Sequence, residues 1–105
     1  MNLTDEVLFE AVDGVAIVTI DRPAARNAIN AGVIEGLRLA WQRLAEDDTL
    51  RVGILTGSGD KAFCAGMDLK VAAATQLRVP ARDMFPVLGD VVKLDKPVIA
   101  AVNGV

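Results

Sequence analysis

An apolar run that ends in a glycine turn constrains this chain more than any other stretch. Residues 52–56, Val-Gly-Ile-Leu-Thr, are almost continuously apolar, and the turn Gly57–Asp60, Gly-Ser-Gly-Asp, follows directly. A strand of this composition is typical of a sheet that is covered on both faces. Next comes Ala62–Leu69, Ala-Phe-Cys-Ala-Gly-Met-Asp-Leu, where a helix is expected to begin near Asp68. A strand, a glycine turn and a helix start form a place where backbone N–H groups can face a ligand.

The residues before this stretch predict a hairpin followed by a helix. Val7–Val12 and Val15–Ile20 are strand-like, and the Asp13-Gly14 pair between them suits a two-residue type I′ turn. Asn30 is a suitable N-cap for the helix that follows. The apolar stripe of that helix has helical spacing and consists of Val33, Leu37, Ala40, Trp41 and Leu44. Acidic residues at 46–48 oppose the helix dipole, so this end is expected to fray.

The residues after it predict two more helices and a strand. We expect helices over 68–77 and 81–94, separated by a break at Arg78–Pro80, and a strand at Val98–Val102. Strands that alternate with helices indicate the α/β class.

Composition limits the size and the partners of the domain. The 105 residues suffice for one small domain, and 52% of them are hydrophobic. Such a small domain buries only a modest share of its surface, so a partner subunit or further chain is expected to cover some apolar area. The net charge of −3 argues against nucleic acid or an anionic membrane as the main partner. Acids at the N-terminus, in place of a basic signal-peptide start, favour a cytoplasmic location.

The residue types restrict the chemistry. The chain has no histidine and no tyrosine, so acid–base chemistry must use a carboxylate, a lysine, Cys64 or a bound water. Cys64 lies between two apolar residues and is interpreted as a small buried side chain rather than a nucleophile. Metal-ligand spacing and a Walker phosphate loop are absent from the sequence. The glycines at 57 and 59 fit a dinucleotide pattern, but the acid-terminated second strand of that fold is missing.

Two residues in the central stretch have open interpretations. Asp68 is either a helix cap or a general base. Gly66 permits a positive φ, so the N–H of Met67 could point outward at a ligand oxygen. Chemistry that forms an enolate from a thioester needs such a donor, and losing one typically costs roughly 2.7–4 kcal/mol of transition-state stabilisation. From the residues alone, an oxyanion site and an ordinary turn both remain open.

Four ordered motifs resemble the N-terminal part of the crotonase superfamily, the enoyl-CoA hydratase/isomerase proteins. They are Gly14–Ile20, Arg22–Asn30, Leu55–Leu69 and Lys96–Gly104. The resemblance implies an α/β fold, the N-terminal part only of a crotonase-like ββα spiral. It also implies that residues 1–105 are the N-terminal part of a single domain, which ends before the family's glycine-rich second oxyanion turn and its catalytic carboxylates.

The resemblance also implies roles for particular residues. The backbone N–H of Met67 matches the family's first oxyanion donor and is the expected catalytic group. Arg26 and Ala28 match positions that contact coenzyme A, and Arg26 and Lys70 are expected to meet the nucleotide phosphates. The implied substrate-binding residues are Arg26, Ala28, Ala65, Gly66, Met67, Asp68, Leu69 and Lys70. No metal is implied, and no cofactor beyond the coenzyme A that the substrate carries.

The implied function is that of an acyl-CoA enzyme, with enoyl-CoA hydratase favoured. Water would add to a 2-enoyl-CoA thioester through an enolate held in a backbone oxyanion hole. The alternative within the class is an enoyl-CoA isomerase, and the alternative from another class is a non-catalytic CoA-binding or assembly module. The implied partners are an acyl-CoA thioester and, at full length, further copies in a homotrimer or hexamer, with no nucleic acid and no membrane. The 105-residue chain itself is expected to have at most residual activity.

Overall fold

A computed structural model of the chain describes residues 1–69 and 94–105. Of the helices expected over 68–77 and 81–94, only residues 68, 69 and 94 fall within these ranges. Leu69 is helical, as a helix start near Asp68 predicts. The remainder of both expected helices, and Lys70, lie outside the described residues.

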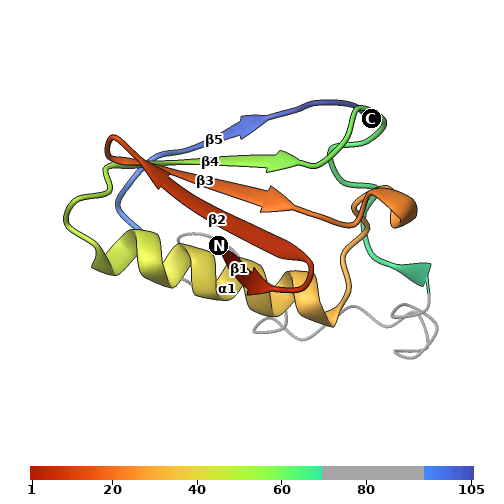
Figure 1. The fold of residues 1–105 in the computed structure, drawn as a ribbon, viewed down its shortest axis with the longest axis horizontal. Coiled ribbons are helices and arrows are strands. Elements are labelled where there is room, and N and C mark those ends of the chain that lie inside the picture. The colour runs from red at the N-terminus through yellow and green to blue at the C-terminus, as the bar shows by residue number, and fades with distance from the viewer. Residues whose placement is uncertain (70–93) are drawn as a thin grey trace.

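Five strands form one sheet in the order β1-β2-β3-β4-β5 (Figure 1). Their bounds are Asn2–Thr4 for β1, Val7–Val12 for β2, Val15–Ile20 for β3, Val52–Gly57 for β4 and Val98–Ala101 for β5. The β1–β2 and β2–β3 pairs are antiparallel, whereas β3–β4 and β4–β5 are parallel. Strand β1 was not expected from the sequence. The mixed sheet and its helix confirm the predicted α/β class.

The predicted hairpin is present between β2 and β3. Val12 pairs with Val15, and the two residues between them have φ of 50° at Asp13 and 82° at Gly14. Both values are positive, as a type I′ turn requires. Beyond β3, Pro23–Ala25 form a short 3₁₀ turn. Proline has no N–H to donate to a strand ladder, so it suits a position just after a strand.

Helix α1, Ala31–Glu46, packs on one face of the sheet and connects the parallel strands β3 and β4 (Figure 1). Its N-cap is Asn30, whose side-chain oxygen accepts a hydrogen bond from the Val33 N–H at 2.9 Å. All five residues of the predicted stripe are buried, Trp41 at 2% exposure. They contact a core that comprises Val7, Phe9, Ala16, Val18, Ile20 and Leu50.

The carboxyl end of α1 is stabilised by a cation from a distant part of the chain. The Lys96 ammonium donates to the carbonyl oxygens of Leu44, at 2.6 Å, and Asp47, at 2.8 Å. Leu44 is in the last turn of the helix, where carbonyls lack a partner within the helix, and Asp47 is its C-cap. A positive charge at this end also interacts favourably with the negative end of the helix dipole. The helix is intact to Glu46. The expectation of fraying considered only the acids local to this end and omitted Lys96.

Strand β4 is covered less completely than its composition predicted. Gly53 faces α1, and a Cβ built there would lie 2.8 Å from Leu44. On the opposite face, Val52, Ile54 and Thr56 are only half-buried, and in the neighbouring β5 Ile99 is 57% exposed. Within the described residues, α1 covers one face of the sheet, so the prediction of cover on both faces is wrong there.

In residues 1–69 and 94–105, no helix combines the length and the apolar character that a membrane span needs.

Candidate functional site

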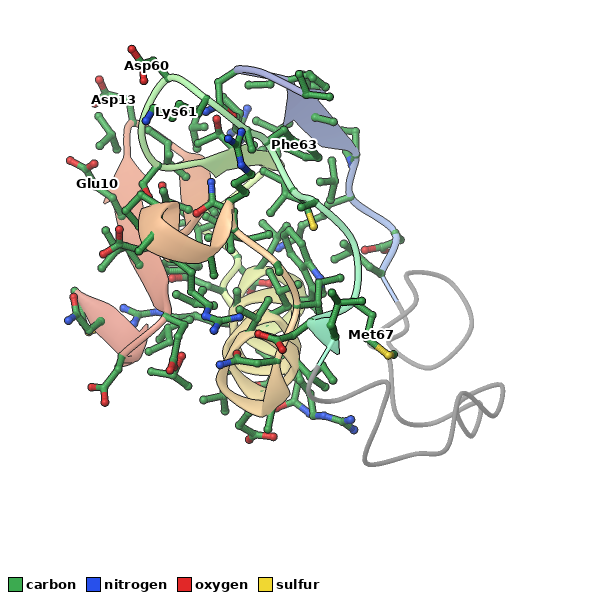
Figure 2. All side chains as sticks on the ribbon, turned by 90° about the vertical axis from the view of Figure 1, so that its right-hand side faces the viewer. Glu10, Asp13, Asp60, Lys61, Phe63 and Met67 are labelled. Carbon is green, nitrogen blue, oxygen red and sulfur yellow. The ribbon has the colours of Figure 1, made fainter. Side chains whose placement is uncertain are left out.

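Two loops meet beyond the carboxyl ends of the parallel strands β3 and β4. Ile20 and Gly57, the last residues of these strands, are register partners. The chain continues from them as residues 21–30 and 58–69, which hydrogen-bond to each other at several points. In open sheets with parallel strands, ligands bind outside this edge. Figure 2 shows Asp60 and Lys61 on the turn after β4, and Phe63 and Met67 further along the same segment.

The backbone N–H of Met67 points away from the neighbouring loop. Ile29 and Met67 form an isolated parallel bridge. In it, the Ile29 N–H donates to Gly66 O at 2.7 Å, and the Asp68 N–H donates to Ile29 O at 2.8 Å. In a trans peptide the C=O and N–H point in opposite directions, and the Gly66–Met67 peptide is trans. Because the Gly66 carbonyl points toward Ile29, the Met67 N–H is directed to the side that the bridge leaves open.

Gly66 is required by its backbone conformation. Its φ is +95°, in the region that residues with a side chain rarely adopt. A Cβ at this position would meet nothing within 4 Å, so crowding is not the reason for glycine. The sequence prediction that Gly66 uses a positive φ is therefore confirmed.

A pocket of about 550 Å³ lies between the two loops. Its lining comprises Ala24, Ala25, Arg26, Ala28, Ala65, Met67, Asp68 and Leu69. Residues from two segments about forty positions apart in the sequence are thus brought to one cavity. All the predicted substrate-binding residues except Gly66 and Lys70 line it. Gly66 lies in the chain between two lining residues, and Lys70 is outside the described residues.

Arg26 joins the loops through its backbone and leaves its side chain exposed. It adopts a left-handed conformation, with φ of 52°, and its carbonyl accepts from the Ala65 N–H at 3.1 Å. The residue is exposed at the pocket's edge. Its guanidinium is therefore accessible to an anion, whereas Ala28 is buried and forms part of the pocket wall.

Asn27 was not identified from the sequence, and it fixes the turn after β4. Its side chain is fully buried, and its amide nitrogen donates to Ser58 O at 3.0 Å and to Ala62 O at 2.8 Å. Its amide oxygen accepts from the Arg22 N–H at 2.9 Å. The turn is also close to this amide, because a Cβ at Gly57 would lie 2.6 Å from the Asn27 nitrogen.

Asn103 holds the same turn from the other end of the chain. Its side-chain oxygen accepts from the Gly57 N–H at 3.1 Å, and its nitrogen donates to Gly59 O at 2.9 Å. The Phe63 N–H donates to Val105 O at 3.0 Å, so the C-terminal residues lie along this segment. The periodicity of apolar residues in a sequence does not identify an asparagine whose side-chain amide holds a turn. The only signal for these two asparagines was their presence in motifs of the family resemblance.

Asp68 accepts from an arginine that sequence reasoning had not connected with it. The Arg22 Nη1 donates to Asp68 Oδ2 at 3.1 Å and to Ala28 O at 2.7 Å. Asp68 also directly precedes the helical Leu69, where a cap residue would lie. The two interpretations from the sequence, a helix cap and a general base, therefore did not include the ion pair of this carboxylate with Arg22.

Cys64 is half-buried and packs against the hydrophobic core. Its packing agrees with the interpretation as a small structural side chain, although its burial is incomplete. In residues 1–69 and 94–105, no three or more Cys, Asp or Glu side chains are grouped so that they could hold a metal ion.

Comparison with known proteins gives one consistent family. Residues 10–105 match the model of the enoyl-CoA hydratase/isomerase family. The chain is 40% identical to an (E)-benzylidenesuccinyl-CoA hydratase of Thauera aromatica, over 93% of this chain and 39% of that protein. It is 46% identical to a carnitinyl-CoA dehydratase of Salmonella paratyphi B, over 83% of this chain and 34% of that protein.

Solved structures give the same result for the fold. An enoyl-CoA hydratase of Mycobacterium marinum superposes with a TM-score of 0.77 at 46% identity, covering 94% of this chain and 38% of that one. A carnitinyl-CoA dehydratase of Mycobacterium avium superposes with a TM-score of 0.78 at 45% identity, covering 94% and 40%. The chain therefore spans about two fifths of the length of these proteins.

Proposed function

Because the chain belongs to the enoyl-CoA hydratase/isomerase family, we propose that it is the N-terminal part of an acyl-CoA enzyme that adds water to a 2-enoyl-CoA thioester. In this proposal the Met67 N–H is one donor of an oxyanion hole. The observation that carries the proposal is the direction of that N–H, which the Ile29–Met67 bridge turns away from the neighbouring loop.

The donor suits the charge that such a reaction develops. When water adds at C3 of a 2-enoyl thioester, negative charge moves to the thioester oxygen and an enolate forms. A fixed N–H aimed at that oxygen stabilises the charge in the transition state more than in the substrate. One donor of this kind is typically worth about 10²–10³ in kcat.

The pocket beside Met67 suits the coenzyme A part of the substrate. Its volume, about 550 Å³, is in the usual range for a small-molecule site. Small side chains at Ala28 and Ala65 leave room, and the exposed Arg26 is accessible to a phosphate. A guanidinium binds phosphate oxygens in a bidentate manner. The relatives named above are a hydratase and a dehydratase of CoA thioesters, which favours hydration over isomerisation.

Acetoacetyl-CoA tests the oxyanion proposal directly. This 1,3-dicarbonyl thioester loses a proton to give an enolate, whose ultraviolet absorbance measures the ionised fraction. Bound to a protein that contains this chain, it should ionise at lower pH than free in solution. Met67→Pro removes the N–H and should abolish that shift, while Met67→Leu keeps the N–H and should retain it. Binding without any shift, or a shift that persists in Met67→Pro, would overturn the proposal.

Crotonyl-CoA then separates an enzyme from a binding module. Loss of its enoyl absorbance on incubation with a protein that contains this chain measures hydration. A protein that binds coenzyme A by calorimetry but leaves crotonyl-CoA unchanged would be the non-catalytic module instead.

A further inference from the structure

We propose that Arg22 is a positioning residue for the Met67 N–H. Its guanidinium joins Ala28 to Asp68 and thereby fixes the peptide that carries the donor. The inference rests on the proposed oxyanion role of Met67, and it adds a side chain on which that backbone group depends.

The arginine bridges the two segments right beside the pair that orients the donor. Ala28 and Asp68, which accept from Nη1 at 2.7 and 3.1 Å, are the chain neighbours of Ile29 and Met67. Those two residues are themselves joined through the Gly66 carbonyl and the Asp68 N–H. Arg22 thus adds a side-chain link one residue beyond a bridge that has only two backbone hydrogen bonds.

The bridge needs such support because it is isolated. It lies outside the strands of the sheet, and in residues 1–69 and 94–105 only one other backbone hydrogen bond, from the Ala65 N–H to Arg26 O, joins its two segments. The peptide that it orients also begins at Gly66, whose backbone has the widest conformational freedom of any residue. A rotation of this one peptide would swing the Met67 N–H away from its direction while barely moving the rest of the loop.

Arg22 is itself held in place, unlike an ordinary surface arginine. Its backbone N–H donates to Asn27 Oδ1 at 2.9 Å, and its carbonyl accepts from the Ala25 and Asn27 N–H groups, both at 2.9 Å. The Arg22 and Asp68 side chains are only 20% and 16% exposed. A charge-assisted pair with this burial is less screened by salt than an exposed one.

The pocket lining does not include Arg22. A substitution there should therefore weaken the orientation of the donor without removing a coenzyme A contact. This separates a positioning role from a binding role and gives the experiment two independent readouts.

The test compares Arg22→Met with Arg51→Met in a protein that contains this chain. Arg51 is an exposed arginine at the opposite end of β4 and serves as the matched control. We expect Arg22→Met to reduce the stabilisation of bound acetoacetyl-CoA enolate about tenfold, part of one donor's usual effect, while the Kd for coenzyme A changes less than about threefold. Arg51→Met should change neither.

Amide hydrogen exchange gives a readout that does not depend on a ligand. The Asp68 and Ile29 N–H groups are the bridge donors, so Arg22→Met should accelerate their exchange relative to the core of β3. Asp68→Ala should also accelerate this exchange, because it removes one of the two acceptors of the Arg22 guanidinium. Arg22→Lys, which keeps the charge on a shorter side chain, should give an intermediate effect and serves if Arg22→Met does not fold.

The failures of the two proposals differ. If the unaltered chain shows no enolate stabilisation, the proposed function fails and this inference fails with it. If the unaltered chain stabilises the enolate and Arg22→Met and Arg22→Lys do so equally well, only the positioning role is refuted. An equal loss of enolate stabilisation and coenzyme A affinity would also refute it.

Discussion

Replacement of Asn27 by alanine should be among the most destabilising single changes in the chain. The side chain is fully buried and makes three hydrogen bonds, to the Ser58 and Ala62 carbonyls and from the Arg22 N–H. A typical hydrogen bond contributes about 1 kcal/mol net, so the three together contribute about 3 kcal/mol. Alanine at a φ of 57° adds about 1 kcal/mol of backbone strain. The expected loss in the free energy of unfolding is therefore about 4 kcal/mol.

Two further substitutions separate these contributions. Asn27→Gly removes the same hydrogen bonds but adopts a positive φ readily, so it should cost about 1 kcal/mol less than Asn27→Ala. Asn27→Asp keeps the shape and the acceptor for the Arg22 N–H, but it turns an oxygen toward two carbonyl oxygens. It should therefore be at least as destabilising as alanine, despite being isosteric.

Urea unfolding followed by tryptophan fluorescence measures these changes. Trp41 is the sole tryptophan and is 2% exposed in the core, so its emission reports unfolding of the domain. Asn2→Ala, in an exposed position on β1, is the matched control. Protein domains have a total stability of about 5–15 kcal/mol, so a loss of about 4 kcal/mol is easily detected. An Asn27→Ala variant within about 1 kcal/mol of the unaltered chain would refute the reasoning.

Three other predictions concern the end of α1 and the donor peptide. Lys96→Met should lower the free energy of unfolding by about 1.5–3 kcal/mol, because it removes a cation that donates to the carbonyls of Leu44 and Asp47 at the end of α1. Equal thermal stability of the two proteins would contradict this. The hydrogen bonds that the Thr49 hydroxyl and N–H donate hold the pKa of Asp47 below its ordinary value of 3.8. The stability that this carboxylate contributes is thus present above pH 3.8 and is lost as the pH falls through the lower pKa of the folded state. Asp47→Asn should therefore flatten the acid end of a curve of unfolding free energy against pH, and an unchanged curve would contradict this prediction. In Gly66→Ala the added Cβ would contact no other atom, but alanine does not easily keep φ at +95°. The variant should therefore stabilise the enolate less in the acetoacetyl-CoA assay, and unchanged enolate stabilisation would contradict this prediction.

The elements that follow local rules could be predicted from the sequence. The type I′ turn at Asp13-Gly14, the cap at Asn30 and the buried stripe of α1 depend on residues within a few positions of one another, and each is confirmed. The short strand β1 has no such local signature, because its pairing with β2 and the contact of Thr4 with Gly32 O define it.

The contacts that position the site could not be predicted in the same way. Arg22 and Asp68 are 46 positions apart, and Asn103 is 46 positions from Gly57. Residue type and spacing do not tell which partner a polar side chain meets after the chain has folded. The motif around Gly66 and Met67 indicated where a donor would lie. The side chains that hold it became visible only in three dimensions.

The position of Asn103 implies an order of assembly on the ribosome. The hairpin and α1 form from contacts between near neighbours, so they can fold while later residues are still being added. The turn after β4 receives its second amide only from Asn103, 46 residues after Gly57. Strand β5 must therefore be synthesised and paired before that turn is held from both sides. The turn that precedes the backbone donor is therefore held from both sides only after the residues of the hairpin and α1 have all been synthesised.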